Sequence, residues 1–187
     1  MMDSPAPFMP IPTPACLPLT AEREASLRDV VVREALSWSG TPYQQLADVK
    51  GPDGGIDCSM HLVRVWVDSG LVAPFDPRPY PPSWHMHQSE ERYLHWMEAV
   101  AVEVAAPQPG DIAIFRFGRC FSHGGIVLPG GRIVHAMMQH GVCSVSDLHE
   151  AFLAKERPDG KARLKWADRP RKFFDVFAGI RRWAEAH

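Results

Sequence analysis

The stretch Gly55-Ile56-Asp57-Cys58-Ser59 decides the fold of this chain, because it joins a glycine-rich loop to an apolar helix. The loop spans 51–55, and the spacing of the apolar residues that follow predicts a helix over 58–70. A thiol at the start of a helix has its pKa lowered by the helix dipole, which favours the reactive thiolate. Cys58 is therefore a candidate nucleophile.

Two histidines downstream complete a nucleophilic site. Ser122-His123 and Val134-His135-Ala136 lie in short apolar runs that are joined by Pro129-Gly130-Gly131, a sequence typical of a hairpin turn. Paired strands bring the two imidazoles together if both face the same side of the sheet. His123 is then predicted to be the general base and His135 the group that orients it. The backbone N–H at the start of the helix is predicted to serve an oxyanion.

The rest of the chain divides into a helical first half and a strand-rich second half. Thr20 is predicted to cap a helix that Gly40 ends, and another helix is predicted over 89–102. The predicted fold class is therefore α+β, with N-terminal helices packed on an antiparallel β-sheet or meander. The strands are predicted at 111–117, 124–128, 132–137 and 142–145, followed by a helix at 147–155 and a strand at 173–180.

A single domain is predicted over 20–187, since a chain of 187 residues that is 45% hydrophobic is long enough to bury one core. The proline-rich stretch 1–19 is predicted to be an irregular arm, disordered or laid out on a partner, and 73–88 a rigid insert of prolines and aromatics. Segment 155–187 holds ten Lys/Arg against five Asp/Glu, although the whole chain has a net charge of −2. This basic segment is interpreted as a solvated surface, with docking of an acidic partner as the alternative.

Composition also bears on location and partners. No apolar run is long enough to span a membrane, and the first twenty residues lack the basic start and apolar run of a secretory signal. The protein is therefore expected to be made in a cytoplasm with reduced thiols. No arrangement of basic and aromatic residues predicts nucleic-acid binding. The four cysteines are Cys16, Cys58, Cys120 and Cys143.

Five motifs, in the same order along the chain, resemble those of the NlpC-type cell-wall cysteine peptidases, a papain-like family. They are Gly40-Thr41-Pro42-Tyr43, Gly55-Ile56-Asp57-Cys58-Ser59, the strand 109–115, Ser122-His123 and Val134-His135-Ala136. The resemblance implies a papain-like fold in which Cys58 is the nucleophile, His123 the base and His135 the orienting residue. The chain has Gly124 after the base histidine, where the family usually has an apolar residue.

The resemblance further implies that Tyr43 lines the site near the oxyanion, while Asp57 and Ser59 hold the polar end of a stem peptide. The family typically cleaves the amide between D-glutamate and a diamino acid in peptidoglycan, and it needs no cofactor. The chain is most similar to the versions of tailed phages and gene-transfer particles, because 76–85 resembles an insert in those proteins. A place at the virion tail tip, among other tail-tip or hub proteins, is the expectation that follows.

Three alternatives stay open. The pairs Cys58–His61 and Cys120–His123 both have Cys-x-x-His spacing and together supply four zinc ligands. This zinc hypothesis leaves His135 unexplained, so no metal or cofactor is predicted, and His61 is expected at the surface or beside the site. The second alternative is a structural tail-tip subunit with the same fold and an inert thiol, and the third is a thiol acyltransferase.

Overall fold

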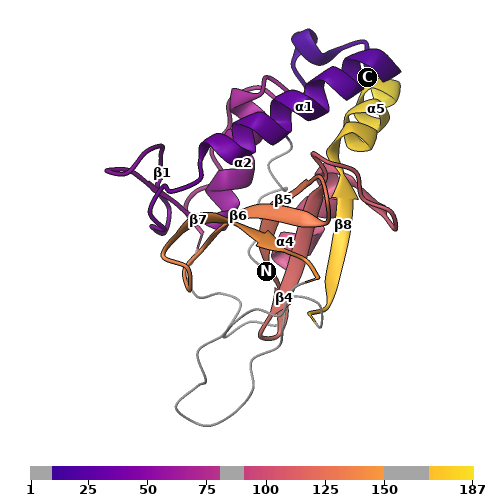
Figure 1. Cartoon of the computed structure of the whole chain (residues 1–187). Helices are drawn as coiled ribbons and strands as arrows, with labels where there is room; N and C mark the ends of the chain where they lie inside the picture. The colour runs from indigo at the N-terminus through magenta and orange to yellow at the C-terminus, as the bar shows by residue number, and fades with distance from the viewer. Residues whose placement is uncertain (1–9, 81–90, 150–168) are drawn as a thin grey trace, which may run out of the picture.

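The computed structural model describes residues 10–80, 91–149 and 169–187. Within these ranges, helices lie beside an antiparallel sheet, and the last helix returns to lie near the first (Figure 1). The predicted α+β class is confirmed. The helices are α1 (Ala21–Ser37), α2 (Cys58–Asp68), α4 (Arg92–Val100) and α5 (Val176–Ala186), with a short 3-10 helix at Pro14–Cys16.

The larger sheet has six strands in the order β3-β8-β4-β5-β6-β7. Strands β4 to β7 form the predicted meander, while β8 comes from the far end of the chain and pairs with both β3 and β4. A two-stranded sheet, β1 with β2, leads into α2. The strands are β1 (Asp48–Val49), β2 (Gly55–Ile56), β3 (Val102–Val104), β4 (Ile112–Phe117), β5 (Cys120–Leu128), β6 (Arg132–Met137), β7 (Val142–Asp147) and β8 (Arg171–Asp175).

Side-chain caps start the first two α-helices where the sequence predicts. The Thr20 hydroxyl accepts a hydrogen bond of 3.2 Å from the Arg23 N–H at the start of α1. The Asp57 carboxylate accepts from the N–H groups of Ser59 and Met60 at the start of α2. Such caps satisfy N–H groups that have no partner within the helix, so both starts are fixed locally.

The β5–β6 hairpin forms as predicted around Pro129-Gly130-Gly131. Leu128 pairs with Arg132 across the turn, and both glycines have φ above +70°, which side chains with a Cβ rarely adopt. On the other side of β5, the ladder with β4 skips Ser122, so a bulge lies directly before His123. Bulges turn nearby side chains, and this one sits where the predicted base begins its strand.

The predicted strand at 173–180 is wrong in its second half. Strand β8 ends at Asp175, and the Asp175 carboxylate accepts from the N–H groups of Phe177 (2.8 Å) and Ala178 (3.1 Å). This cap starts α5, so the apolar residues that followed the strand lie on a helix instead. Gly179 lets α5 approach closely, because an added Cβ would lie 2.1 Å from the Val100 carbonyl oxygen.

The helix predicted over 89–102 is shorter at its end. Helix α4 stops at Val100, and Val102–Val104 forms β3, because this stretch finds a partner in β8. Residues 81–90 and 150–168 lie outside the described part of the chain. Three predictions therefore fall wholly or partly outside the described residues: the start of the helix at 89, the end of the insert, and most of the helix at 147–155. Asp147, the first residue of the last of these helices, ends β7.

The core has two layers, one on each face of the larger sheet. The larger layer lies between the helices and the sheet, and it includes Val31 and Ala35 of α1 as well as Leu62 and Trp66 of α2. A smaller layer covers the opposite face. Its buried members are Ala113, Phe115, Val127, Ile133, Met137 and Leu148.

Arg28 is a buried ionic centre that the helical pattern of α1 does not predict. Its guanidinium lies 2.7 Å from the Asp111 carboxylate, 3.0 Å from Asp175 and 2.8 Å from Glu24. It also stacks 4.4 Å from the centroid of the Phe177 ring. One side chain thus joins α1 to the start of β4 and to the β8–α5 junction.

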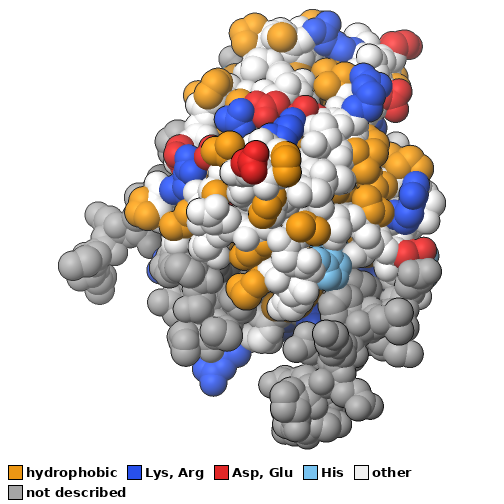
Figure 2. All heavy atoms as spheres, turned by 60° about the vertical axis from the view of Figure 1, so that its left-hand side comes forward, with side chains coloured by type: hydrophobic (Ala, Val, Ile, Leu, Met, Phe, Trp, Pro, Cys, Tyr) orange, Lys and Arg blue, Asp and Glu red, His pale blue; other side chains and the backbone are white. Residues whose placement is uncertain are grey.

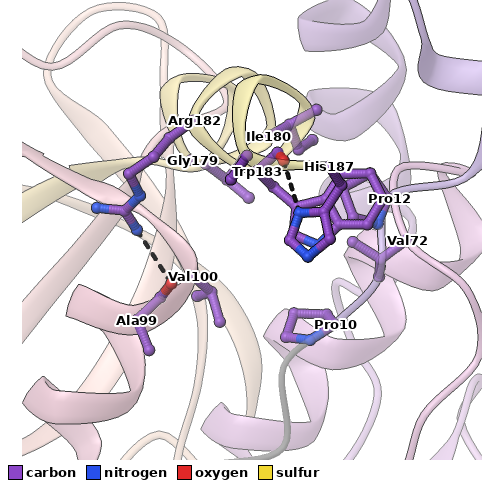
Figure 3. Close-up of a pocket in the computed structure, with 12 residues that line it drawn as sticks. Pro10, Pro12, Val72, Ala99, Val100, Gly179, Ile180, Arg182, Trp183 and His187 are labelled. Atoms are coloured by element: carbon purple, nitrogen blue, oxygen red, sulfur yellow. Dashed lines mark hydrogen bonds between the residues drawn. The ribbon is translucent and has the colours of Figure 1, made fainter.

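The described part of the predicted arm, residues 10–19, packs on the domain itself. The N–H of Thr13 donates to the Leu71 carbonyl (3.0 Å), and Cys16 is fully buried. A cavity of about 190 Å³ lies between Pro10 and Pro12 of this arm, the end of α4 and Trp183 of α5 (Figure 3). None of the predicted site residues lines this cavity.

The basic residues of the described C-terminal segment are largely paired within the chain. Arg181 forms an ion pair with Glu24, Lys172 pairs with Glu103, and Arg182 donates to backbone carbonyls at the end of α4. On the face seen in Figure 2, acidic and basic side chains are mixed rather than separated. Among the described residues, no helix is long and apolar enough to cross a membrane.

Candidate active site

Cys58 lies at the first position of α2 with its sulfur against strand β5. The sulfur is 3.9 Å from the carbonyl oxygen of Ser122, and the backbone N–H of Gly124 is near enough to lower the pKa of the thiol. These two residues flank His123 in the sequence. The fold therefore brings the predicted nucleophile to the strand position of the predicted base, although 65 positions separate them in the chain.

The two predicted histidines meet across the sheet. The Nε2 atom of His123 is 2.7 Å from the Nδ1 atom of His135, and the rings are nearly perpendicular. On its other side, the Nε2 atom of His135 is 2.8 Å from the Ser146 hydroxyl on β7. Both histidines are buried. The result is a hydrogen-bonded chain from His123 through His135 to Ser146.

These hydrogen bonds leave Nδ1 of His123 as the basic nitrogen in the tautomer in which Ser146 is the acceptor. Burial is the largest cause that lowers the pKa of His135 well below its usual value, so this imidazole is neutral at pH 7. When Ser146 accepts from Nε2–H of His135, the Nδ1 of His135 accepts from Nε2–H of His123. The lone pair of His123 is then on Nδ1, as a base requires. Sequence reasoning missed Ser146, because a serine in a half-exposed strand carries no distinguishing signal.

The pKa of the Cys58 thiol is raised overall in this state, although the backbone N–H of Cys58 at the helix start lowers it as predicted. Burial and the charge of Asp57 raise the pKa of Cys58 to about 12, against smaller lowering effects from Gly124 and Ser59. The cause is local: Asp57 places a carboxylate at the helix N-terminus and takes the N–H groups of Ser59 and Met60. The negative charge of Asp57 therefore opposes the effect of the helix N-terminus on the thiol.

The carboxylate of Asp57 makes its hydrogen bonds within the protein. Besides capping α2, its carboxylate accepts from the Leu46 N–H (2.7 Å) and from the Tyr80 hydroxyl, which lies 2.7 and 2.8 Å from the two oxygens. Its residue is 1% exposed. Tyr80 belongs to the predicted insert, so this part of the insert folds back onto the site. A role in holding substrate stays a prediction for Asp57, whose observed role is to join α2, the preceding loop and the insert.

Tyr43 and Ser59 also lie at the thiol, as the resemblance implies. The Tyr43 hydroxyl donates to Gln45 (3.1 Å), and its pKa is raised by burial and then by the charges of Cys58 and Asp57. The Ser59 hydroxyl is near enough to lower the pKa of Cys58. The structure thus gathers all six predicted site residues around Cys58 and the β5–β6 hairpin, and their catalytic and binding roles remain predictions.

The zinc alternative is not supported by the geometry. His61 is fully buried rather than at the surface, and its Nε2 atom faces the Ala35 carbonyl (3.3 Å) and the Cys143 sulfur (3.9 Å), whereas the Cys58 sulfur faces β5. The apolar surroundings lower the pKa of His61 to about 4. Within the described ranges, no group of three or more His, Cys, Asp or Glu side chains is placed to hold a metal ion. Cys16, Cys120 and Cys143 are buried, whereas Cys58 is partly exposed.

Comparison with known proteins agrees with this geometry. The model of the NlpC/P60 family matches residues 35–158, which is more than half of the chain. Among solved structures, the peptidoglycan hydrolase RipB of Mycobacterium tuberculosis has a TM-score of 0.51 at 18% identity, over 84% of this chain and 68% of that one. NlpC1 of Trichomonas vaginalis has a TM-score of 0.51 at 18% identity, over 79% of this chain and 43% of that one.

A third structure is RipD of Mycobacterium tuberculosis, which is described as a non-catalytic NlpC/p60 domain protein adapted to peptidoglycan binding. It has 16% identity and a TM-score of 0.47, over 80% of this chain and 97% of that one. The comparison with curated proteins gave no match.

The chain belongs to the NlpC/P60 family. Proteins of this family are generally peptidoglycan hydrolases of the cysteine-peptidase class. The papain-like fold that the motifs implied is the fold of these solved structures.

Proposed function

We propose that this protein is a cysteine peptidase that hydrolyses amide bonds in the stem peptides of peptidoglycan. The observation that carries the proposal is the convergence of three elements: the Cys58 sulfur at the start of α2 lies against β5 at His123, which is hydrogen-bonded to His135 at 2.7 Å. Membership of a family of peptidoglycan hydrolases supports the substrate class.

In the proposed reaction, the Cys58 sulfur attacks the scissile carbonyl carbon while its proton passes to Nδ1 of His123. The resulting tetrahedral oxyanion receives a hydrogen bond from the Cys58 backbone N–H at the helix start. Collapse breaks the C–N bond, and His123 returns the proton to the leaving amine. Water then attacks the thioester with His123 again as base, which releases the carboxylic acid and restores the thiol. His135 orients His123 and stabilises its charged form throughout.

The test is incubation of the purified full chain with solubilised peptidoglycan, followed by mass spectrometry of the products beside Cys58→Ala. We expect new stem-peptide fragments from the wild-type protein, and at least about 10³-fold less product from the variant, because it lacks the nucleophile. Cys143→Ala is the matched control, since this buried thiol has its sulfur 3.9 Å from Nε2 of His61. Equal product from wild type and Cys58→Ala would contradict the proposal.

One observation favours the structural alternative. The resting thiol donates toward the Ser122 carbonyl, and a pKa of about 12 leaves roughly one thiol in 10⁵ ionised at pH 7. A tail-tip subunit with an inert thiol would show this state permanently. Absence of cleavage, together with alkylation of Cys58 no faster than that of an ordinary thiol, would support this alternative.

We propose, on the resemblance of 76–85 to an insert of tail-tip proteins, that the chain acts at the tip of a phage-like tail, where neighbouring tail proteins are its partners. The bond proposed for cleavage is the one between the γ-carboxyl of D-glutamate and a diamino acid. Mass spectrometry of purified tailed particles tests the location, and particles that lack the chain would contradict it. The mass of the fragments above identifies the bond.

A further inference from the structure

The chain has three tyrosines, and each is near enough to Cys58 for the charge of the thiolate to raise the pKa of its phenol. Tyr43 comes from the loop before the nucleophile, Tyr80 from the insert and Tyr93 from α4, and the charges of Cys58 and Asp57 raise the pKa of each phenol in addition to burial. Two of these hydroxyls are occupied: Tyr43 donates to Gln45 and Tyr80 to Asp57. The third has no assigned role in the reaction described above.

The Tyr93 hydroxyl is buried and has no hydrogen-bond partner among the described residues. The residue is only 7% exposed, and its ring is held by Trp96, with ring centroids 6.3 Å apart. A buried donor without a partner is costly, and native structures rarely keep one without a use. Because its pKa is raised well above the usual value, this phenol keeps its proton at neutral pH.

Gly124 explains how Tyr93 reaches the site. A Cβ added at Gly124 would lie 2.3 Å from the Tyr93 hydroxyl oxygen and 3.1 Å from Leu62, so only glycine leaves room for the phenol. The backbone N–H of the same Gly124 lowers the pKa of the Cys58 thiol, and Ser122, earlier on the same strand, has its carbonyl oxygen 3.9 Å from the sulfur. The glycine after the base histidine and the unpartnered phenol therefore form one arrangement beside the thiol.

We propose that Tyr93 donates a hydrogen bond to the sulfur of Cys58 when the thiol is ionised. The proton leaves Cys58 for His123, the negative charge remains on sulfur, and the Tyr93 O–H turns from its unpartnered position toward that charge. A hydrogen bond to an ionised acceptor is stronger than one to a neutral acceptor, so it favours the thiolate over the thiol. The proposal rests on Cys58 being the nucleophile.

Other groups near the sulfur also change the pKa of the thiol. Asp57 disfavours the thiolate through its charge, while Ser59 and the Gly124 N–H favour it. His123 receives the proton from its position on β5. Tyr43 and Tyr80 lie near the sulfur, but their hydroxyls are bonded elsewhere. Tyr93 is the phenol whose donor remains unused in the described structure.

The test measures the pKa of Cys58 in the full chain from the pH dependence of its alkylation by iodoacetamide, with the Cys58 peptide quantified by mass spectrometry. We expect Tyr93→Phe to raise the pKa of the thiol by about one unit, so that alkylation at neutral pH slows about tenfold. Trp96→Phe is the control, since it changes the packing of the Tyr93 ring and keeps its hydroxyl. An unchanged pKa in Tyr93→Phe, or an equal shift in Trp96→Phe, would overturn the proposal.

A second variant covers the case in which Tyr93→Phe does not fold. Gly124→Ala displaces the hydroxyl by its Cβ and is expected to raise the pKa of the thiol in the same direction, and no shift would overturn the proposal. In the Tyr93→Phe background, Gly124→Ala is expected to cost less stability, because the contact at 2.3 Å is gone and the nearest atoms are then Leu62 Cδ1 at 3.1 Å and the ring carbon at 3.2 Å. Alkylation needs no peptidoglycan, so a protein that fails to cleave stem peptides still tests Tyr93 separately.

Discussion

Replacing His123 by alanine is expected to lower kcat for stem-peptide hydrolysis roughly 10⁴-fold at pH 7. The reason is the high pKa of Cys58, about 12, which leaves almost no thiolate unless a base accepts the proton during attack. Once His123 is absent, only the small ionised fraction of the thiol reacts. The measurement is steady-state hydrolysis of a purified stem peptide, with circular dichroism to verify that the variant is folded.

The pH profile distinguishes loss of the base from loss of structure. For His123→Ala we expect the residual rate to rise about tenfold per pH unit from pH 7 to 10, since the thiolate fraction grows by that factor below a pKa of about 12. Ser146→Ala is the matched comparison, because it removes only the last hydroxyl of the hydrogen-bonded series and leaves His123 and His135 in contact. We expect a loss of about tenfold and a profile like that of the wild type. A flat profile in His123→Ala would contradict the assignment of His123 as base.

Replacing Arg28 by alanine is expected to lower the free energy of unfolding by about 3–5 kcal/mol. The change leaves the carboxylate of Asp111 buried without its cation. It also removes the nearer of two cations beside Asp175, whose carboxylate caps α5. Burial raises the pKa of Asp111, so part of the loss appears as uptake of a proton by this carboxyl in the variant. Urea unfolding followed by circular dichroism measures the loss.

Arg64→Ala is the matched control for this experiment. Arg64 and Asp68 form an ion pair of 2.6 Å on the surface of α2, with a third of the Arg64 side chain exposed. Exposed pairs at this spacing contribute about 0.3–0.5 kcal/mol, because water and salt screen them. A loss for Arg28→Ala no larger than that for Arg64→Ala would show that the buried ionic centre does not stabilise the fold as proposed.

Several parts of the fold followed from short stretches of sequence. The start of α2 at Cys58, the cap at Thr20 and the turn at Pro129-Gly130-Gly131 were predicted correctly, because a cap or a glycine acts on the residues beside it. The strand predicted over 173–180 is wrong in its second half, and the reason is again a local cap. Asp175 is also a helix cap, whereas the apolar residues on both sides of it do not distinguish a strand from a helix.

The sequence by itself determined the family motifs, their order and the identity of the thiol and the two histidines. Only the tertiary structure decided what surrounds them. Arg28 and Asp175 meet across 147 positions of chain, Ser146 reaches His135 through strand pairing, and Tyr93 enters beside Cys58 because Gly124 has no side chain. The tertiary structure also decides the raised pKa of Cys58, since burial depends on every segment packed around the sulfur. Caps, turns and motifs are encoded by adjacent residues, whereas burial and charge are set by groups that only the folded chain brings together.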